Sequence, residues 1–374
     1  MNTTGRGLSF ASGEIRVDLA ALVSNFRALQ AIAQPAEVAA VVKADAYGLG
    51  AVSVSEALAA AGCRHFFVAQ LDEALIVRGA VAEPEIYILN GLAAGSEGAA
   101  ESLRFTPVLN SLGQLERWRD LALARAKRLP AVIQLDTGMS RLGLPPEHLA
   151  WLAENPQVFS DLEVRYLMSH LACAETPDAD SNVEQLKALE AAAARLPATP
   201  LSLANSAATL ALPNTRRDLV RCGLALYGCA GGTGLADALR PVVRLTARVL
   251  QVRTVPAGAG VGYGLTYRAD GPRRIATISV GYADGVPRAL GDVGAVYLDD
   301  DRLPIVGRVS MDTLTVDATD LPAGAVQPGA MVELIGPHQR LEDLAAQAGA
   351  IPHEILTGLG RRLPRTYQYS QGEA

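Results

Sequence analysis

The feature that most constrains the fold is a regular alternation of short apolar segments with helical ones through the first two thirds of the chain. Eight apolar segments have the length of a buried strand: residues 38–42, 65–70, 85–90, 106–109, 131–136, 164–170, 201–206 and 219–226. Helical patterns separate them, most clearly at residues 52–61, 72–79, 112–128 and 182–196. Eight strands that alternate with helices predict an α/β fold, a (β/α)8 TIM barrel.

The pattern changes near residue 240. From Pro241 onward, runs such as VVRLTARVLQVRTV and RRIATISVGY alternate apolar and polar residues, which is typical of antiparallel strands. One short helix is expected at residues 341–348, and the segment EIRV at residues 14–17 is a candidate extra strand for the same domain. We therefore expect a barrel domain over residues 1–240, except for that candidate strand, and a mostly β domain over residues 241–374.

Polar side chains gather where the predicted barrel strands end. Barrels of this kind hold their chemistry at the carboxyl ends of the strands. Five of the eight ends carry residues suited to acid–base chemistry or anion binding: Lys43, Asp136 with Thr137–Arg141, His170, Asn205 with Ser206, and Arg221. Each has a structural explanation when taken singly, such as a capping histidine or a paired arginine. Their coincidence on one face of the barrel favours a functional site there.

Lys43 is the most informative of these residues. It directly follows the apolar run Val38–Val42, whereas the other two lysines of the chain, Lys127 and Lys187, lie in polar helical segments. A lysine at the end of a buried strand must be paired, neutralised or used. A desolvated amine is the group that condenses with a carbonyl to form a Schiff base. A lysine that merely extends into solvent is the structural alternative, and this stretch alone leaves both open.

Composition argues against several classes of partner. The chain has 374 residues, of which 49% are hydrophobic, enough for a substantial core. The formal net charge is -6 and no basic block is present, so we expect no nucleic-acid partner. We also expect no membrane partner and a cytoplasmic location, because neither a ~20-residue apolar run nor a signal-peptide pattern is evident. The four cysteines lack CxxC spacing, so they are expected to be reduced, and no metal site is predicted.

Eight motifs together resemble those of the bacterial alanine racemase family in order and spacing. They are VVKADAYGLG, DTGMSRLG, SHLA, NSAA, RCGLALYG, VGYGLTY, VGYADG and GRVSMD. The likeness runs from about Ile15 to Tyr367 and includes both expected domains. It implies a fold-type III pyridoxal 5'-phosphate enzyme that interconverts L-alanine and D-alanine, supplying D-alanine for peptidoglycan. It also implies a head-to-tail homodimer whose active sites are shared between chains.

The resemblance assigns the cofactor site to the barrel. Lys43 corresponds to the lysine that binds the cofactor covalently, and Arg221 to the arginine that faces the pyridine nitrogen. Because arginine does not surrender its proton, that nitrogen should stay unprotonated. Hydroxyl and amide donors at strand-to-helix turns suit a dianionic phosphate. The implied cofactor contacts are Lys43, Tyr47, His170, Ser206, Arg221, Gly223 and Leu224.

Racemisation needs a proton removed from one face of Cα and returned on the other. The resemblance implies that Lys43 serves one face and that Tyr263, from the second domain of a partner chain, serves the other. A phenol has a pKa near ~10, so the tyrosine needs help, which a hydrogen-bonded chain through His170 and Arg221 would provide. The implied substrate contacts are Arg141, Met311, Asp312 and Tyr282, the last at the entrance.

Three positions depart from the family pattern. Gln134 stands where many members carry a lysine that is often carbamylated, so another group must orient Arg141. Ser310 replaces a common cysteine, a small change that we expect to be tolerated. Arg361 occupies the position of a phosphate-contacting tyrosine in some members, so the phosphate site is expected to differ in one contact.

Other functions fit the sequence less well. A serine or broad-specificity racemase stays open, because a small pocket discriminates weakly against one added hydroxyl. An amino-acid decarboxylase of the same architecture is less favoured, because the HxGS and CDxxD motifs are missing. A non-enzymatic pyridoxal phosphate carrier built on a lone barrel is disfavoured by the long β domain and by Tyr263 within it.

Overall fold

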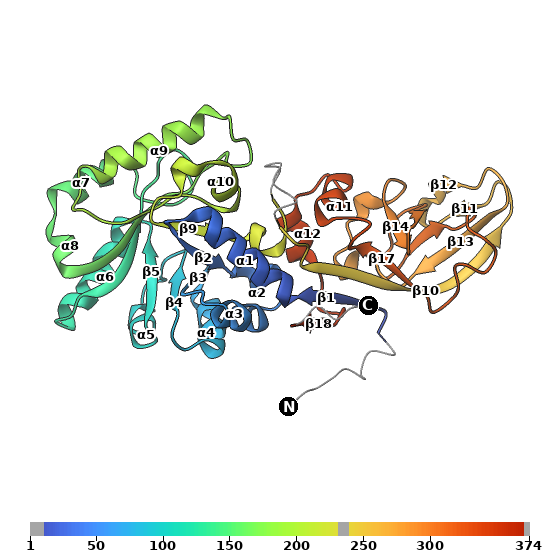
Figure 1. Ribbon diagram of the computed structural model, residues 1–374, viewed down its shortest axis with the longest axis horizontal. Helices are drawn as coiled ribbons and strands as arrows, with labels where there is room; N and C mark the ends of the chain where they lie inside the picture. The colour runs from blue at the N-terminus through green and yellow to red at the C-terminus, as the bar shows by residue number, and fades with distance from the viewer. Residues whose placement is uncertain (1–10, 231–238, 370–374) are drawn as a thin grey trace. The chain divides into compact units, whose positions relative to one another are not determined.

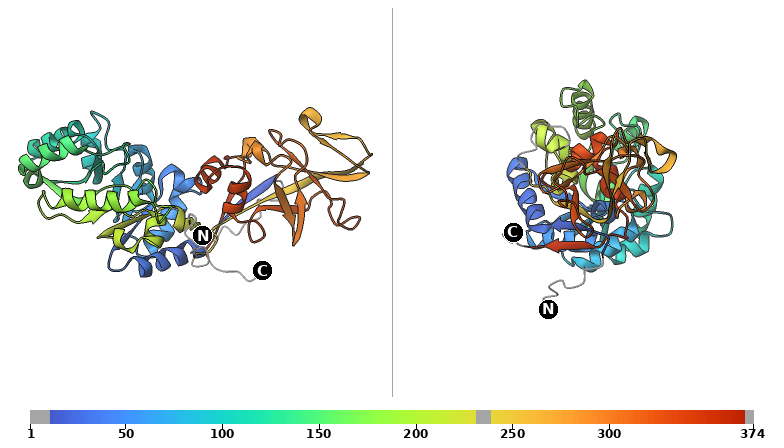
Figure 2. Two further views of the ribbon diagram at one scale, coloured as in Figure 1. Left: turned by 90° about the horizontal axis from the view of Figure 1, so that it is seen from above. Right: turned by 90° about the vertical axis from the view of Figure 1, so that its right-hand side faces the viewer.

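The computed structural model describes residues 11–230 and 239–369, and it divides into two compact units. The first unit is Ala21–Arg240. The second combines the chain before Ala21 with the residues from Pro241 onward. Figure 1 follows the chain through both units, and Figure 2 gives two further views of each.

The first unit confirms the predicted barrel. Its eight strands are parallel neighbours in the order β8-β7-β6-β5-β4-β3-β2-β9. The terminal strands of this order meet, because the Asp218 N–H donates to the Leu201 carbonyl (3.0 Å) and the Arg221 N–H to the Ala204 carbonyl (2.9 Å). The strands are β2 Glu37–Val41, β3 His65–Val68, β4 Glu85–Ile88, β5 Phe105–Leu109, β6 Leu129–Gln134, β7 Leu162–Met168, β8 Leu201–Ser202 and β9 Leu219–Cys222.

Most barrel strands end earlier than their apolar patterns suggested. β8 stops at Ser202 and β9 at Cys222, four residues before the expected ends at 206 and 226. β7 ends at Met168, so His170 lies in the loop after the strand rather than in it. The apolar pattern continues past these ends because the following turns are also buried, and burial rather than strand pairing is what hydrophobicity reports.

Helices surround the strands of the barrel (Figures 1 and 2). Their buried side is mostly apolar: α3, for example, buries Ala51, Val54, Ala57 and Leu58 along with Ser55. The elements are α1 Leu19–Ala33, α2 Lys43–Tyr47, α3 Ala51–Ala60, α4 Leu71–Ala80, α5 Glu97–Ser102, α6 Leu112–Ala124, α7 Pro146–Glu154, α8 Gln157–Asp161, α9 Asp180–Ala193 and α10 Ser206–Ala211, with the 3-10 turns η1 Pro213–Thr215 and η2 Leu224–Tyr227.

The second unit is built around one long strand, β10. This strand spans Val243–Val255 and pairs antiparallel with β1, β13 and β17. β1 contains the EIRV segment and also pairs with β18 in parallel. The strands are β1 Gly13–Asp18, β10, β11 Gly260–Val261, β12 Tyr267–Arg268, β13 Arg273–Ile278, β14 Ala295–Leu298, β15 Asp301–Pro304, β16 Leu314–Asp317, β17 Met331–Ile335 and β18 Arg365–Gln368.

Short helical segments complete the second unit. The expected helix is present as α11, Leu341–Gln347, and a second helix, α12 Pro352–Gly358, follows it. The seven residues of α12 begin with proline, which suits a first helical turn, but the helix is too short for a clear periodic signal. Three 3-10 turns are η4 Tyr263–Leu265, η5 Tyr282–Asp284 and η6 Arg288–Leu290. Among the described helices, none combines the length and apolar character needed to cross a membrane.

Candidate functional site

Lys43 follows β2 at the carboxyl end of the barrel, where the backbone takes a rare conformation. The next four residues, Ala44 to Tyr47, all have positive φ, at 52°, 55°, 53° and 58°. They form one left-handed turn, closed by the Gly48 N–H donating to the Ala44 carbonyl (2.8 Å). A left-handed conformation costs L-residues roughly 1–2 kcal/mol each. Such strain persists only where surrounding contacts impose it, and it is concentrated at functional sites.

The environment of Lys43 lowers the pKa of its amine. Burial is the largest cause, and the positive charges of Arg141 and Arg221 act in the same direction. The negative charge of Glu73 opposes them and raises the pKa. A lowered pKa increases the fraction of unprotonated amine at neutral pH, the form that attacks a carbonyl and accepts a proton. By contrast, Lys127 is exposed to solvent and pairs with Glu101.

Arg221 lies buried at the end of β9 and organises its neighbours. Its guanidinium donates to the Ser202 hydroxyl (2.7 Å), the Ser169 carbonyl (2.7 Å) and His170 Nδ1 (3.1 Å). Burial lowers the pKa of Arg221 to about 10, so it stays cationic at neutral pH. Burial and the nearby cations lower the pKa of His170 to about 3. The imidazole is therefore neutral at neutral pH, with Nδ1 as acceptor and the proton on Nε2.

Tyr47, Ser206 and Gly223 meet where β9 ends. The Ser206 hydroxyl accepts from the Gly223 N–H (2.9 Å) and from the Ala225 N–H (3.2 Å). A Cβ at Gly223 would lie only 2.3 Å from the Tyr47 hydroxyl, so only glycine allows the phenol to come so close. Leu224 begins η2 beside them and is buried. Hydroxyls and backbone amides gathered where a strand ends are donors of the kind that suit a phosphate group; in this structure the Gly223 and Ala225 amides donate to Ser206.

The loop after β6 carries Arg141. The Asp136 carboxylate shapes its first part by accepting from the N–H groups of residues 138, 139 and 140 (2.9 Å, 3.0 Å and 3.1 Å). Gln134 fixes the second part, because its buried amide donates to the Leu142 carbonyl at 3.1 Å. Gln134 therefore holds the backbone directly after Arg141 without any added charge. Where many family members carry a carbamylated lysine, this chain thus has an uncharged glutamine that hydrogen-bonds to the loop.

Tyr263 lies in η4 of the second unit, and its side chain is 72% exposed. The glycines on either side of it both have positive φ, 70° at Gly262 and 75° at Gly264. A Cβ at Gly264 would lie 3.3 Å from the Arg308 guanidinium, so this turn packs against Arg308. The conformation thus presents the phenol at the surface of the unit.

Tyr282, Met311 and Asp312 lie together on the second unit. The Tyr282 N–H donates to the Ser310 carbonyl and the Ala283 N–H to the Met311 carbonyl, both at 3.0 Å. Arg362 links the two segments: it donates to both carboxylate oxygens of buried Asp284 (2.9 and 2.8 Å) and to Asp312 (2.6 Å). Ser310 takes part through its backbone, which is consistent with tolerance of serine at this position.

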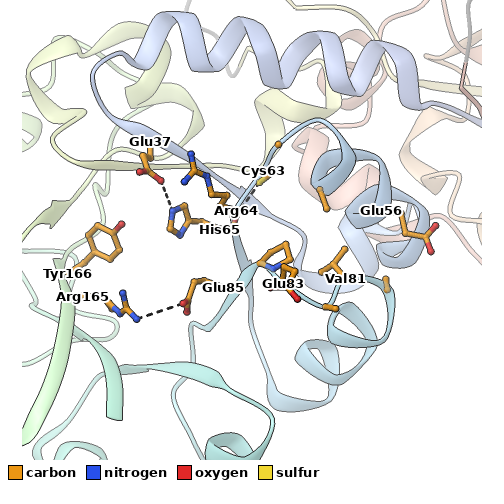
Figure 3. A pocket seen from close by; sticks show the side chains of 15 residues that line it. Glu37, Glu56, Cys63, Arg64, His65, Val81, Glu83, Glu85, Arg165 and Tyr166 are labelled. Atoms are coloured by element: carbon orange, nitrogen blue, oxygen red, sulfur yellow. Dashed lines mark hydrogen bonds and ion pairs between the residues drawn. The ribbon is translucent and has the colours of Figure 1, made fainter. Parts of the chain in front are cut away.

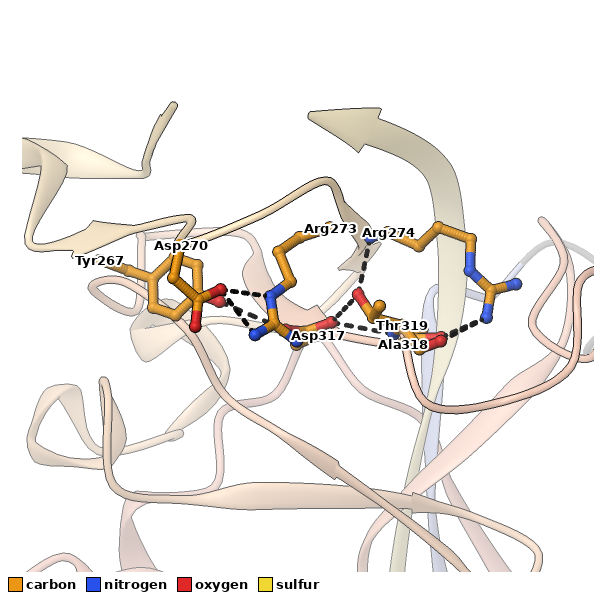
Figure 4. A network of polar contacts seen from close by, with 7 residues as sticks. All are labelled: Tyr267, Asp270, Arg273, Arg274, Asp317, Ala318 and Thr319. Atoms are coloured by element: carbon orange, nitrogen blue, oxygen red, sulfur yellow. Dashed lines mark hydrogen bonds and ion pairs between the residues drawn. The ribbon is translucent and has the colours of Figure 1, made fainter. Parts of the chain in front are cut away.

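A second polar network supports the segment that leads away from Tyr263 (Figure 4). Asp317, at the end of β16, accepts from the Tyr267 hydroxyl at 3.2 Å and lies 3.6 Å from the Arg273 guanidinium. Arg273 also pairs with Asp270 in the loop between β12 and β13. Beneath this network, Val261, Ile275 and Val306 form a small apolar cluster against which Tyr267 packs. The β11–β12 hairpin is thereby attached to β13 and β16.

A pocket of about 910 Å³ lies at the other end of the barrel (Figure 3). It is lined by Glu37, His65 and Glu85, the first residues of β2, β3 and β4, and by Arg165 and Tyr166 of β7. His65 Nε2 lies 2.6 Å from Glu37, and Arg165 lies 3.8 Å from Glu85. Polar residues at the amino ends of barrel strands usually serve stability, so we place the candidate site at the opposite end, with Lys43.

The structure brings the expected site residues together in two groups. In the barrel, these are Lys43, Tyr47, Arg141, His170, Ser206, Arg221, Gly223 and Leu224. In the second unit, Tyr282, Met311 and Asp312 lie on two segments that are hydrogen-bonded to each other, and Tyr263 lies in η4. Their roles stay predictions. Sequence reasoning missed Glu73, Ser202 and Arg362; only Glu73 had a local signal, its place three residues after Gln70 at a helix start.

Family models match nearly the whole chain. The alanine racemase N-terminal domain matches residues 17–231, and the alanine racemase C-terminal domain matches residues 242–367. A catabolic alanine racemase of Agrobacterium fabrum is 49% identical over 96% of this chain and 92% of its own length. An alanine racemase of Brucella canis is 48% identical over 97% of this chain and 95% of its own.

Solved structures agree with these matches. The alanine racemase of Bartonella henselae, crystallised with covalently bound pyridoxal phosphate, superposes with a TM-score of 0.93 at 44% identity, covering 96% of this chain and 100% of that one. The biosynthetic alanine racemase of Pseudomonas aeruginosa gives a TM-score of 0.89 at 35% identity, with the same coverage of both chains. Fold and sequence therefore point to one family.

Proposed function

Because the chain belongs to the alanine racemase family, we propose that it interconverts L-alanine and D-alanine with pyridoxal 5'-phosphate bound covalently to Lys43. The observation that carries this proposal is the amine of Lys43, held at the carboxyl end of β2 with a lowered pKa. It lies among the cations Arg141 and Arg221, in a site with donors suited to a phosphate. A nucleophilic amine and a group of phosphate-binding donors, here called the phosphate cradle (Tyr47, Ser206, Gly223 and Leu224), are two features that a pyridoxal phosphate site requires.

The residues at the end of β9 would hold the phosphate. The Tyr47 and Ser206 hydroxyls and the backbone at Gly223 and Leu224 form this part of the proposed site. Arg221 would face the pyridine nitrogen, where a permanently protonated guanidinium donates a hydrogen bond and leaves the ring nitrogen unprotonated. His170 supports Arg221 from the side through Nδ1. When bound, the cofactor supplies a conjugated electron acceptor that makes the Cα proton of the substrate acidic.

Two residues of the chain would move that proton. Lys43 accepts or donates it on one face of Cα, a role suited to an amine whose pKa is lowered by burial. Tyr263 acts on the other face, and its exposure allows it to enter the site of another chain. Arg141 and the Met311 backbone, with Asp312 beside it, would bind the substrate carboxylate. Tyr282 would narrow the entrance.

We propose that the active enzyme is a head-to-tail homodimer in which Tyr263 of one chain completes the barrel site of the other. The surface residues of the second unit support this arrangement, because Tyr263, Leu265, Tyr282 and Met311 are 72%, 49%, 42% and 52% exposed. Exposed apolar and aromatic groups of this kind mark interaction surfaces. In the cell, we place the enzyme in the cytoplasm, where D-alanine would enter peptidoglycan precursors.

Borohydride reduction and a chiral assay test the function together. Reduction of the purified enzyme should attach one pyridoxyl group per chain to the peptide that contains Lys43, and peptide mass spectrometry would locate it. Label on Lys127 or Lys187 instead would contradict the site. Racemisation of alanine should exceed that of serine in kcat/KM; the reverse order would favour a serine or broad-specificity racemase.

A further inference from the structure

Glu73 contacts the left-handed turn after Lys43 from the neighbouring helix α4. Within the turn, the Ala46 N–H donates to the Val42 carbonyl and the Gly50 N–H to the Asp45 carbonyl, both at 2.9 Å. These bonds close the turn on itself but do not attach its first residue to the rest of the barrel. The Ala44 N–H, directly after Lys43, donates instead to Glu73 Oε1 at 2.7 Å.

The second oxygen of the same carboxylate serves the neighbouring strand. Glu73 Oε2 accepts from the Ala69 N–H (2.6 Å) and from the Gln70 N–H (3.1 Å), where β3 leads into α4. Glu73 is the third residue of α4, the position from which a glutamate caps a helix start. Capping explains the contacts of Oε2 but not the contact of Oε1, which reaches a residue 29 positions earlier in the chain.

Only a carboxylate can make all three contacts. An ionised glutamate offers two acceptor oxygens, whereas glutamine offers one oxygen and an amide nitrogen that only donates. A glutamine at this position would therefore turn a donor toward either the Ala44 N–H or the N–H groups of residues 69 and 70. Hydrogen bonds to an ionised acceptor are also stronger than those to a neutral one.

We propose that Glu73 is a positioning residue for Lys43: its carboxylate fixes the strained turn, and with it the lysine, to the start of α4. The proposal rests on the function proposed above, in which Lys43 binds the cofactor and moves the substrate proton. The charge of Glu73 also acts on Lys43. It raises the pKa of the Lys43 amine, against the lowering by burial and by the charge of Arg141.

The test compares Glu73→Gln and Glu73→Asp with the matched control Glu97→Gln. Glu97 begins α5 and likewise accepts a backbone N–H at a helix start, since its Oε2 accepts from the Gly95 N–H at 2.7 Å. Its Oε1 accepts from Arg117 Nε at 2.7 Å, so its carboxylate joins Gly95 to Arg117 rather than to the Lys43 turn. Aspartate keeps the charge and can still cap α4, but its shorter side chain would not reach Ala44. The two variants at Glu73 therefore separate position from charge.

The first measurement uses the full chain without cofactor. Competitive acetylation of lysines over a pH series, read by peptide mass spectrometry, reports the protonation of Lys43, with Lys127 and Lys187 as internal references. For Glu73→Gln, the Lys43 profile should move to lower pH, because a negative charge is lost. The profiles of Lys127 and Lys187, and of all three lysines in Glu97→Gln, should be unchanged.

The second measurement is kcat/KM of the cofactor-loaded enzyme. A small displacement of Lys43 should lower it about 10–100-fold in both Glu73 variants, mainly through kcat. An unchanged rate in Glu73→Asp would overturn the positioning role, and this variant decides the question if Glu73→Gln does not fold. A Lys43 profile in folded Glu73→Gln identical to that of the wild type would overturn the role of the charge.

The outcomes separate this inference from the proposed function. If the wild type racemises alanine and the Glu73 variants match it, the positioning role is wrong and the function stands. If the wild type fails to racemise alanine, the function is wrong. In that case, a shifted Lys43 profile in Glu73→Gln still supports the link between the two residues, and an unshifted one contradicts it.

Discussion

The neutral state of His170 follows from its immediate neighbours. Arg221 donates to Nδ1 from one side, and the charges of Arg141 and Lys43 lie close enough to disfavour an imidazolium. A cation at this position would repel the guanidinium that the proposed cofactor site needs. The neutral imidazole of His170 therefore accepts a hydrogen bond from Arg221 through Nδ1.

This environment predicts how stability changes in acid. The pKa of His170 is lowered to about 3 in the folded chain, against about 6.5 for an ordinary histidine. The unfolded chain therefore binds a proton between these values that the folded chain does not. The stabilisation from His170 is complete above pH ~6.5 and is lost progressively as the pH falls toward 3, by up to about 1.4 kcal/mol per pH unit.

His170→Asn keeps an acceptor for Arg221 but cannot be protonated. Its free energy of unfolding should therefore fall less steeply between pH 6.5 and pH 4.5 than that of the wild type. Urea unfolding at several pH values, with each curve fitted separately, measures this difference. Parallel curves for the two proteins would show that His170 is not held neutral by the fold.

Gly223 offers a test of the phosphate cradle at the same scale. Gly223→Ala would place a Cβ 2.3 Å from the Tyr47 hydroxyl and push the phenol out of the cradle. Overpacking of this kind costs roughly 1–3 kcal/mol, so pyridoxal phosphate affinity should fall about 5–150-fold in a spectroscopic titration. The control Gly79→Ala, whose Cβ would meet nothing within 4 Å, should bind normally. Equal affinities in all three proteins would contradict the cradle.

At the scale of elements, hairpins and turns present the reactive groups, and packing beneath them sets their position. The β11–β12 hairpin has only two residues in each strand, so its own hydrogen bonds cannot hold the turn that carries Tyr263. The contacts of Tyr267 with Asp317 and with the apolar cluster attach it to the larger sheet. The conformation around Tyr263 therefore depends on Asp317 and on the apolar cluster beneath the hairpin.

Asp317→Ala tests this dependence. The substitution removes the acceptor of the Tyr267 hydroxyl and of the Thr319 N–H, so the free energy of unfolding of the second unit should fall by about 1–3 kcal/mol. The rate of racemisation should fall, mainly through a lower kcat, with a smaller change in KM. Asp270→Ala is the control: this carboxylate is highly exposed and pairs with the same arginine, so its loss should leave the urea midpoint within error. Equal effects of the two variants would contradict the supporting role of Asp317.

For the whole molecule, the proposed chemistry is divided between two folding units. The barrel carries Lys43, and the β-rich unit carries Tyr263. In the proposed twofold head-to-tail dimer, each β-rich unit would cover the barrel of the other chain. Such an arrangement gives two equivalent sites, each with a lysine and a tyrosine from different chains.

Mixed dimers test whether sites are shared. Lys43→Ala and Tyr263→Phe should each be nearly inactive alone. In a mixed dimer with shared sites, one site collects both substitutions and the other collects neither. Random exchange makes half of the dimers mixed, so roughly a quarter of wild-type activity should return. Differently tagged, co-expressed chains allow the mixed dimers to be isolated, and inactive mixed dimers would show that each chain builds its own site.

The sequence by itself determined the barrel, the β-rich unit and the motifs at the strand ends. These features follow from local patterns: the alternation of apolar segments, the single lysine Lys43 directly after an apolar run, and short motifs such as RCGLALYG. Patterns of this kind need only neighbouring residues to be seen. The ends of β8 and β9 were misplaced because the buried turns after them are equally apolar.

Only the tertiary structure decided which distant groups meet. Closure of the barrel brings Ser202 to Arg221, and the packing of β2 beside β3 brings Glu73 to the residue after Lys43. In the second unit, Arg362 joins Asp284, 78 positions away in the chain, to Asp312, 50 positions away. Such contacts depend on how strands and loops come together in space. Hydrophobic periodicity records which side of an element is buried, but not which partner it meets.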